Sequence, residues 1–438
     1  MMKLTVWGGA GEHGRSAYLL NGCQVHLLLD CGVKKEGAGD YPMIQQEQVP
    51  KLDAVFLSHA HEDHSVAIPL LYRLGYKGEV WTTRETAAQL TAYFASWKEY
   101  TARVGAVLPY MEEDQLAIRY RYLEEEGDRL TWFEAFPGVK VMWGRSGHMV
   151  GAVWFLVEAE GKRIFYSGDY TSESLLLEDD SPALADKPSS TLLDLAIVDA
   201  AYGTDPNSQA DKLRQLEQQI ESTLHSGGKV LLPVPAAGRG QEMIVWAYRN
   251  WRNVPIVIEA PLIEGMKRLR RRSDWLRKKD SGLELRKQLE LLLNRNDWIM
   301  PASVTERESL LQTHGASLWF VTDGMMQSKL AQWYYQQMSG DIRNLVLLTG
   351  HVSQGTFGHR LLQHPASYGA CSVRKIRYKV HQGLADVRRM ISGVPALHTV
   401  LVHADKEETD RLQACLTEEL RDPRIQIYSM SIGEEVCF

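Results

Sequence analysis

The sequence lacks the features that mark membrane, secreted and disulfide-stabilised proteins. No apolar run reaches the length of about 20 residues that a helix needs to cross a bilayer. Only 5 cysteines are spread through 438 residues, an odd number without metal-type pairing, so reduced thiols are expected. The first residues enter a strand-like segment without a secretory leader. We therefore expect a cytoplasmic protein that does not contact a membrane.

The sequence also has no strong excess of charge of one sign. The net charge of −6 argues against a protein whose whole surface is coated with nucleic acid. A local basic channel stays compatible with it, because electrostatic steering depends on the field in a cleft rather than on the total charge. With 44% hydrophobic and 24% charged residues, the chain has the composition of a globular protein. Its length suits two domains.

One short stretch concentrates residues that bind metals. Behind a strand-like run at 52–56 stand three histidines and an aspartate: His59, His61, Asp63 and His64. In extended backbone His59 and His61 project to the same side, whereas Asp63 and His64 are expected in a turn before a helical segment at 66–71. Imidazole and carboxylate ligands suit zinc or a similar divalent ion, which generates hydroxide near neutral pH. The alternative is a fortuitous surface cluster of histidines.

Further candidate residues follow other predicted strands. They stand at strand ends or among glycines just beyond them: His148, Asp169, Asp199 and His403. Loops at one edge of a sheet commonly build a site, so we predict that these residues converge there. A lone histidine such as His148 would by itself more often be structural.

A glycine-rich turn, Gly8-Gly9-Ala10-Gly11, follows the first predicted strand. It could cradle a phosphate, but it lacks the GxGxxG spacing and a Walker lysine. The favoured interpretation is that the backbone passes close to the metal site here. A hairpin around Asn21-Gly22 comes next and closes with Asp30-Cys31-Gly32.

From residue 204 onward, strands alternate with helices of a length that predicts βαβ units and a parallel sheet. We predict a doubly wound domain at 204–370, inserted into a first domain made of 1–203 and 371–438. The most basic stretch of the chain, 267–279, lies in the inserted part. It is either a solvated helix face or a phosphate contact. Three further cations are predicted to alternate along one strand face that leads to His381: Lys375, Arg377 and Lys379.

Together these pieces resemble the metallo-β-lactamase superfamily, and within it the β-CASP family of RNA-processing nucleases, of the ribonuclease J and cleavage-and-polyadenylation endonuclease type. The stretch from His59 to His64 resembles the HxHxDH motif, and Gly147-His148 and Ser167-Gly168-Asp169 resemble the next two motifs. Asp199 is similar to the acidic motif A, where glutamate is usual. His381 and His403 stand at motifs B and C.

The resemblance implies an α/β fold, a metallo-β-lactamase αββα sandwich with an inserted Rossmann-like β-CASP domain. It implies two zinc ions, or other divalent ions, with Asp169 bridging them. One ion would take His59, His61 and His148, and the other Asp63, His64 and His403. His381 is the implied general acid, oriented by Asp199, and Asp63 is counted as a catalytic residue as well as a ligand.

The function implied is a zinc-dependent ribonuclease that hydrolyses the phosphodiester bonds of single-stranded RNA. The predicted RNA contacts are basic: Arg270, Arg271, Arg272, Lys375, Arg377 and Lys379. Two alternatives stay open, a hydrolase of a small ester or thioester on the same fold and a non-catalytic scaffold of RNA processing. Endo- or exonuclease action, the natural RNA and the oligomeric state, a homodimer included, also stay open.

Overall fold

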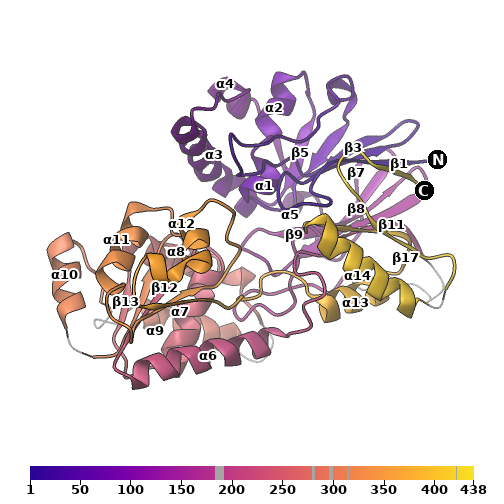
Figure 1. The fold of residues 1–438 in the computed structure, drawn as a ribbon. Helices are drawn as coiled ribbons and strands as arrows, with labels where there is room; N and C mark the ends of the chain where they lie inside the picture. The colour runs from indigo at the N-terminus through magenta and orange to yellow at the C-terminus, as the bar shows by residue number, and fades with distance from the viewer. Residues whose placement is uncertain (183–191, 279–281, 295–298, 314, 421) are drawn as a thin grey trace. The chain divides into compact units, whose positions relative to one another are not determined.

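The computed structural model describes residues 1–182, 192–278, 282–294, 299–313, 315–420 and 422–438 (Figure 1). The chain forms two compact units. The first comprises Met1–Ser172, Asp179–Pro206 and His381–Phe438, and the second comprises Glu173–Glu178 and Asn207–Val380. Among the described residues, no helix is both long and apolar enough to span a bilayer.

The first unit begins with a seven-stranded sheet in the order β19-β1-β2-β3-β4-β5-β6. Its strands are β1 Lys3–Gly8, β2 Ala17–Asn21, β3 His26–Leu29, β4 Ala54–Phe56, β5 Glu79–Thr82, β6 Tyr120–Tyr122 and β19 Glu435–Cys437. The predicted hairpin at Asn21-Gly22 is confirmed, because β2 and β3 pair antiparallel with Asn21 opposite His26. From β3 to β6 the pairing is parallel, so those strands end at one edge.

A second seven-stranded sheet has the order β18-β17-β11-β10-β9-β8-β7. Its strands are β7 Phe133–Phe136, β8 Val139–Arg145, β9 Val153–Ala159, β10 Lys162–Tyr166, β11 Leu193–Asp199, β17 Ala396–Val402 and β18 Gln426–Ser429. Neighbouring strands β10, β11 and β17 run parallel. The residues that follow them therefore meet at one sheet edge, among them Asp169 and His403.

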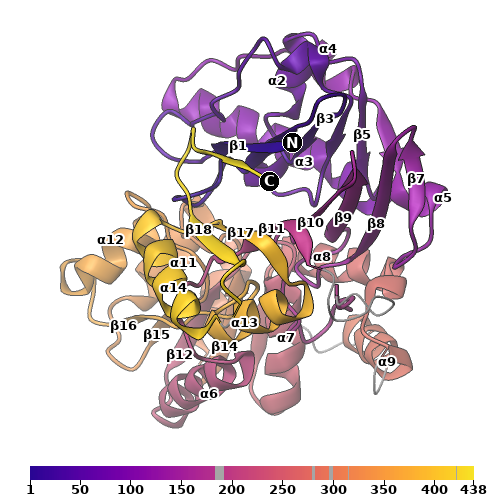
Figure 2. The ribbon, with the colours of Figure 1, turned by 90° about the vertical axis from the view of Figure 1, so that its right-hand side faces the viewer.

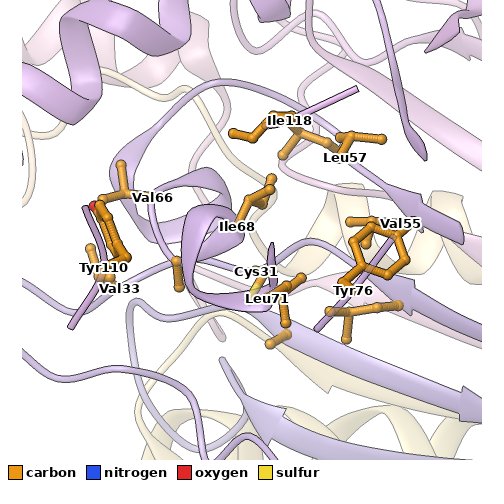
Figure 3. Packing of buried hydrophobic residues seen from close by; sticks show 14 of the residues in the cluster. Cys31, Val33, Val55, Leu57, Val66, Ile68, Leu71, Tyr76, Tyr110 and Ile118 are labelled. Atoms are coloured by element: carbon orange, nitrogen blue, oxygen red, sulfur yellow. The ribbon is translucent and has the colours of Figure 1, made fainter. Parts of the chain in front are cut away.

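Helices cover the outer face of each sheet of this unit (Figures 1 and 2). Helix α2 (Ile68–Arg73) and helix α3 (Arg84–Val104) pack on the first sheet through an apolar cluster that Figure 3 shows around Leu71. Helix α3 begins at the N-cap Thr83, whose side chain accepts from Thr86 N, and ends at Gly105 with φ 72°. Short helices α4 (Glu112–Leu116) and α5 (Leu123–Glu126) follow it.

Helices α13 (Leu384–Gly393) and α14 (Lys406–Glu419) pack on the second sheet. The two sheets meet face to face through aromatic pairs, with ring centroids 5.4 Å apart for Phe56 and Phe155 and 5.6 Å for Tyr18 and Tyr166. The unit is therefore an αββα sandwich, and the predicted fold is confirmed.

The second unit is built on a five-stranded parallel sheet in the order β13-β14-β12-β15-β16. The strands are β12 Lys229–Pro233, β13 Ile256–Ile258, β14 Ser317–Val321, β15 Leu345–Leu348 and β16 Ser372–Lys375. Its helices are α6 Gln209–His225, α7 Arg239–Asn250, α8 Ala260–Arg271, α9 Gly282–Leu293, α10 Val304–Gln312, α11 Lys329–Met338 and α12 Phe357–Gln363. Helices α11 and α12 pack on one face, and the alternate strand residues Val230 and Leu232 are just as buried. Both faces are thus covered, as a doubly wound sheet requires.

The prediction that Lys375, Arg377 and Lys379 lie on one strand is wrong. Strand β16 ends at Lys375, although Ile376 N still donates to Leu348 O at 3.1 Å. Beyond that point Tyr378 N donates to Thr349 O at 2.8 Å and the backbone N–H of Lys379 donates to the side chain of Gln209 at 2.8 Å, so the regular ladder with β15 ends before Lys379. The cations stand at every second position, which is the period of a strand, but the backbone at 376–379 is not a strand.

Candidate metal centre

The first group of candidate ligands consists of three imidazoles from two loops of the first unit. His59 and His61 follow strand β4, and His148 follows β8. His61 Nδ1 lies 3.1 Å from both His59 Nε2 and His148 Nε2. Gly147 has a positive φ of 72°, which lets the chain turn before His148. A side chain would not fit there, because its Cβ would lie 2.2 Å from Thr171 O.

The surroundings of these imidazoles favour their neutral form. Burial, opposed by nearby carboxylates, lowers the pKa of His61 to about 3 and holds the pKa of His148 well below its ordinary value. Burial and the neighbouring His64 lower the pKa of His59 as well. A neutral imidazole is the form that binds a metal ion. Around tetrahedral zinc, with bonds of about 2.0–2.1 Å, ligand atoms stand about 3.3 Å apart, so the observed spacing fits such an ion.

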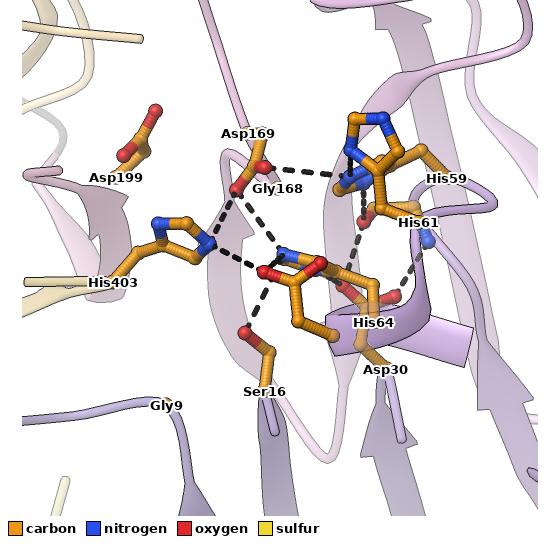
Figure 4. Close-up of polar contacts among 12 residues, drawn as sticks. Gly9, Ser16, Asp30, His59, His61, His64, Gly168, Asp169, Asp199 and His403 are labelled. Atoms are coloured by element: carbon orange, nitrogen blue, oxygen red, sulfur yellow. Dashed lines mark hydrogen bonds and ion pairs between the residues drawn. The ribbon is translucent and has the colours of Figure 1, made fainter. Parts of the chain in front are cut away.

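The second group combines one carboxylate with two imidazoles. Asp63 and His64 lie in α1 (Glu62–Ser65), a one-turn helix with His61 as its N-cap, where the sequence predicted a turn. His403 follows strand β17, and its Nε2 lies 3.0 Å from Asp63 Oδ2. His64 Nε2 lies 3.8 Å from the same oxygen. The ligand atoms of these three side chains lie within 4.8 Å of one another, and Figure 4 shows His403 reaching toward His64 and Asp169.

The second group favours positive charge. Burial opposes the protonation of His403, but Asp169 and Asp63 outweigh it and raise the pKa of His403 to about 9. The same two carboxylates overcome burial and hold the pKa of His64 well above its ordinary value. Burial alone would raise the pKa of Asp63, yet His64 and His403 lower it. A pocket of this kind suits a cation held by mixed oxygen and nitrogen ligands.

Asp169 lies between the two groups and offers one oxygen to each. Its Oδ2 lies 3.3 Å from His59 Nε2 and 3.5 Å from His148 Nε2. Its Oδ1 lies 3.3 Å from His64 Nε2 and 3.7 Å from His403 Nε2. The side chain is only 3% exposed (Figure 4). A carboxylate can bridge two cations, which a neutral imidazole cannot do, so the donor set fits a pair of metal ions.

Asp199 and His381 form a pair beside this cluster. Asp199 ends strand β11, is fully buried, and accepts backbone hydrogen bonds from Tyr170 N at 3.1 Å and Ala201 N at 3.0 Å. His381 Nδ1 lies 3.1 Å from Asp199 Oδ2 and 3.8 Å from Asp169 Oδ2. The histidine is thereby held next to the candidate bridging carboxylate.

Asp30 supports His64, a contact that was not predicted from the sequence. Its Oδ2 lies 2.6 Å from His64 Nδ1 and accepts from Ser58 Oγ at 2.6 Å and Tyr166 Oη at 2.5 Å, while Oδ1 accepts from Ser58 N. Such an outer carboxylate fixes the ring and the tautomer of a metal-binding histidine. The available signal was an aspartate at a strand end, the same pattern that singled out Asp169 and Asp199.

The predicted RNA contacts all lie in the second unit, and the structure separates them by exposure. Arg271 and Arg272 are exposed at the C-terminal end of α8, and Arg270 is half-buried. Lys375 is exposed and Arg377 is half-buried. The Lys379 side chain is 3% exposed and its ammonium pairs with Glu173, so its charge is not presented to a polyanion. Lys279, in the same basic stretch, lies outside the described residues.

Three family models match consecutive parts of the chain. A beta-lactamase superfamily domain matches residues 26–233, a Beta-Casp domain matches 241–361, and a Zn-dependent metallo-hydrolase RNA specificity domain matches 370–429. A solved structure of a protein of unknown function from Enterococcus faecalis V583 has the same fold. It aligns with a TM-score of 0.60 at 14% identity, over 99% of each chain.

Several curated proteins are similar over most of the chain. Endoribonuclease YSH1 of Saccharomyces cerevisiae is 26% identical and covers 93% of this chain and 55% of its own length. Cleavage and polyadenylation specificity factor 73 of Drosophila melanogaster is 24% identical, with 96% and 62% covered. Transcription termination factor FttA of Methanosarcina mazei is 26% identical, with 82% and 58% covered. The chain thus spans little more than half the length of these relatives.

Proposed function

The chain belongs to the β-CASP family of the metallo-β-lactamase superfamily, and we propose that it is a ribonuclease that hydrolyses single-stranded RNA with two zinc ions. The observation that carries the proposal is the position of Asp169, whose two oxygens face two separate groups of candidate ligands. Similarity to proteins named endoribonucleases supports RNA as the substrate. We also propose that the second unit is the inserted β-CASP domain.

The ligand sets proposed for the two ions are the two groups described above. His59, His61 and His148 would hold one ion, Asp63, His64 and His403 the other, and Asp169 would contact both. When bound, such ions supply a nucleophilic hydroxide near neutral pH and offset the negative charge of a phosphate in an in-line displacement. Asp63 would then have two roles. It would bind one ion, and its negative charge would offset part of the positive charge of that ion beside the reacting phosphate.

The leaving oxygen of a cleaved phosphodiester needs a proton, and His381 is the proposed donor. Its Nδ1 lies 3.1 Å from Asp199 Oδ2, and this contact fixes the ring. The other nitrogen, Nε2, would face the substrate. An imidazole can carry the proton until the bond breaks, and the Asp199 carboxylate orients the ring for this transfer. Asp199 is itself fixed by two backbone N–H groups, so the pair is preorganised.

The polyanionic substrate also needs cations away from the reacting bond. Arg271 and Arg272 are the strongest of the predicted contacts, because both residues are exposed at the end of α8. Lysine or arginine at a helix C-terminus also interacts favourably with the helix dipole, which is the alternative reason for their presence. Lys379 is left out of the proposal because it is buried against Glu173.

A gel assay of end-labelled single-stranded RNA tests the proposal. The wild-type chain, loaded with zinc, should cut RNA of defined 5′ phosphorylation, and Asp63→Asn should cut it at least ~10²-fold more slowly. Hydrolysis of small esters without cleavage of RNA would support the small-substrate alternative instead. Absence of both activities, with metal bound, would support the scaffold alternative.

A further inference from the structure

His403 has a strained backbone that a neighbouring loop holds in place. Its φ of 67° lies in the left-handed region, which costs energy for a residue with a side chain. Its backbone N–H donates to Gly9 O at 2.7 Å, and the same oxygen accepts from Tyr18 Oη at 3.1 Å. Gly9 belongs to the glycine loop, defined here as residues 8–16, which passes beside His403 in Figure 4.

The side chain of His403 lacks the outer partner that its neighbour possesses. A histidine that binds a metal through one nitrogen usually donates the other N–H to a carboxylate, a carbonyl or water. His64 follows this pattern, with Nδ1 2.6 Å from Asp30. His403 directs Nε2 at Asp63, while its Nδ1 is buried and no described protein group bonds to it.

Ring packing takes the place of that hydrogen bond. The rings of His64 and His381 stack on His403 with centroids 5.3 Å and 5.1 Å away. His13 meets the ring of His403 edge-on, at 5.6 Å and an interplanar angle of 85°. Edge-to-face pairs of rings at this distance attract each other. His13 belongs neither to the proposed ligand set nor to the proposed proton transfer.

The glycine loop is anchored on both sides of His13. Before it, Gly11 O accepts from Lys406 N at 3.0 Å, which joins the loop to the start of α14. After it, Arg15 pairs with Glu12 at 2.6 Å and donates its backbone N–H to Val33 O at 3.1 Å. A ring on a loop fixed in this way can hold its neighbour at little further cost in conformational entropy.

We propose that His13 is a positioning residue for His403, and that it sets the affinity of the second ligand group for its metal ion. The inference rests on the proposed metal centre and adds to it a residue outside both ligand groups. Because His403 belongs to the second group alone, loss of the His13 ring should lower the affinity of the second group for its metal ion and leave that of the first group unchanged. The contact is one of shape, so an aromatic ring without nitrogen should replace it.

Cobalt titration of the metal-free full chain tests this, with binding followed by visible absorption and calorimetry. His13→Ala should weaken the binding of the second cobalt ion about 2–10-fold, the usual worth of an edge-to-face ring pair, and leave the affinity for the first unchanged. His13→Phe should restore most of the lost affinity, and His13→Gln should not. The matched control is His398→Ala on β17, the strand that His403 follows; the ring of His398 stacks on Tyr428 at 5.7 Å.

The outcomes separate the inference from the function beneath it. Unchanged affinity for both cobalt ions in His13→Ala would overturn the inference. A loss of affinity in His13→Phe as large as that in His13→Ala would overturn it as well. A raised KM for RNA with normal cobalt binding would make His13 a substrate contact instead, which also overturns it. If the wild-type chain takes up no cobalt at all, the proposed metal centre fails, whatever the variants do. Should His13→Ala not fold, the contrast between the phenylalanine and glutamine variants decides.

Discussion

His381 Nδ1 lies 3.1 Å from Asp199 Oδ2, so an aspartate reaches the histidine where the motif usually has the longer glutamate. The shorter side chain reaches because the chain just after β11 lies against the loop after Val380, where Tyr202 N donates to Gln382 O at 3.2 Å. The pair is therefore able to act as proton donor and orienting carboxylate.

The first prediction concerns His381→Ala. We expect turnover of RNA to fall by ~10²–10⁴, the range for removing a general acid, because the proposed proton donor to the leaving oxygen is lost. Metal content should stay that of the wild type, since His381 lies outside the proposed ligand set. Single-turnover cleavage and elemental analysis of the same preparation check both statements. Loss of metal would make His381 a ligand, and normal cleavage would remove it from the mechanism.

The second prediction concerns the coupling of His381 with Asp199. Asp199→Asn should lower turnover by a smaller factor than His381→Ala, since the histidine remains but loses a charged partner. Combining the two changes should add nothing to the effect of His381→Ala alone, because the aspartate acts through the histidine. A double variant whose loss equals the product of the two single losses would show that Asp199 acts independently.

The third prediction concerns Asp30. Asp30→Asn should lower the affinity of the second ligand group for its metal ion about 10–100-fold, because His64 Nδ1 would lose the carboxylate that fixes its ring. Cobalt titration measures the change. Tyr166→Phe is the matched control, since it removes another bond to the same carboxylate, at 2.5 Å, and leaves the histidine contact in place. Equal affinity in Asp30→Asn and wild type would limit Asp30 to a structural role.

The fourth prediction concerns metal removal. Elemental analysis of protein purified without added metal should give two zinc ions per chain, from the two ligand groups that Asp169 joins. Chelation should lower the melting temperature. Zinc at about 100 times its Kd should raise the free energy of unfolding by about 2.7 kcal/mol for each ion bound, because it binds the folded state alone. A melting temperature that ignores both treatments, with no transition metal found, would contradict the proposed centre.

The fifth prediction concerns the basic end of α8. Changing Arg270, Arg271 and Arg272 together to alanine should weaken RNA binding and flatten its dependence on salt. Each lost contact with a single strand changes the slope of log K against log salt by about 0.7, so the two exposed arginines predict a change of about 1.4. Fluorescence anisotropy at several salt concentrations measures it.

The control for the arginine variant is Arg214→Ala, which removes an exposed arginine that pairs with Asp211 on α6. Its slope should match that of the wild type. The same slope in the triple variant would show that the basic end of α8 is a solvated helix face, and the search for RNA contacts would then move to Lys375 and Arg377.

The sequence by itself determined what depends on local backbone geometry. The spacing of His59 and His61 places both side chains on one side of an extended segment, whatever the rest of the chain does. The apolar runs before Asp169, Asp199 and His403 predicted strands, and the structure has strands β10, β11 and β17 there. Alternation of strands and helices predicted the parallel sheet of the second unit for the same reason.

Only the tertiary structure decided which of these strand ends meet. Asp63 and His403 are 340 positions apart and follow strands of different sheets, yet their side chains lie 3.0 Å from each other. The glycine loop binds both segments, since His403 N donates to Gly9 O and Ser16 N donates to Asp63 O. The role of Asp30 was hidden because its partner His64 is 34 positions away, in helix α1.

Burial of Lys379 shows the converse case. In the sequence it is one of three alternating cations, and nothing in that pattern distinguishes it from Lys375. The structure turns it inward to pair with Glu173, 206 positions away. A charge is exposed or buried according to the chain that packs over it, and packing is set by long-range contacts that local patterns do not contain.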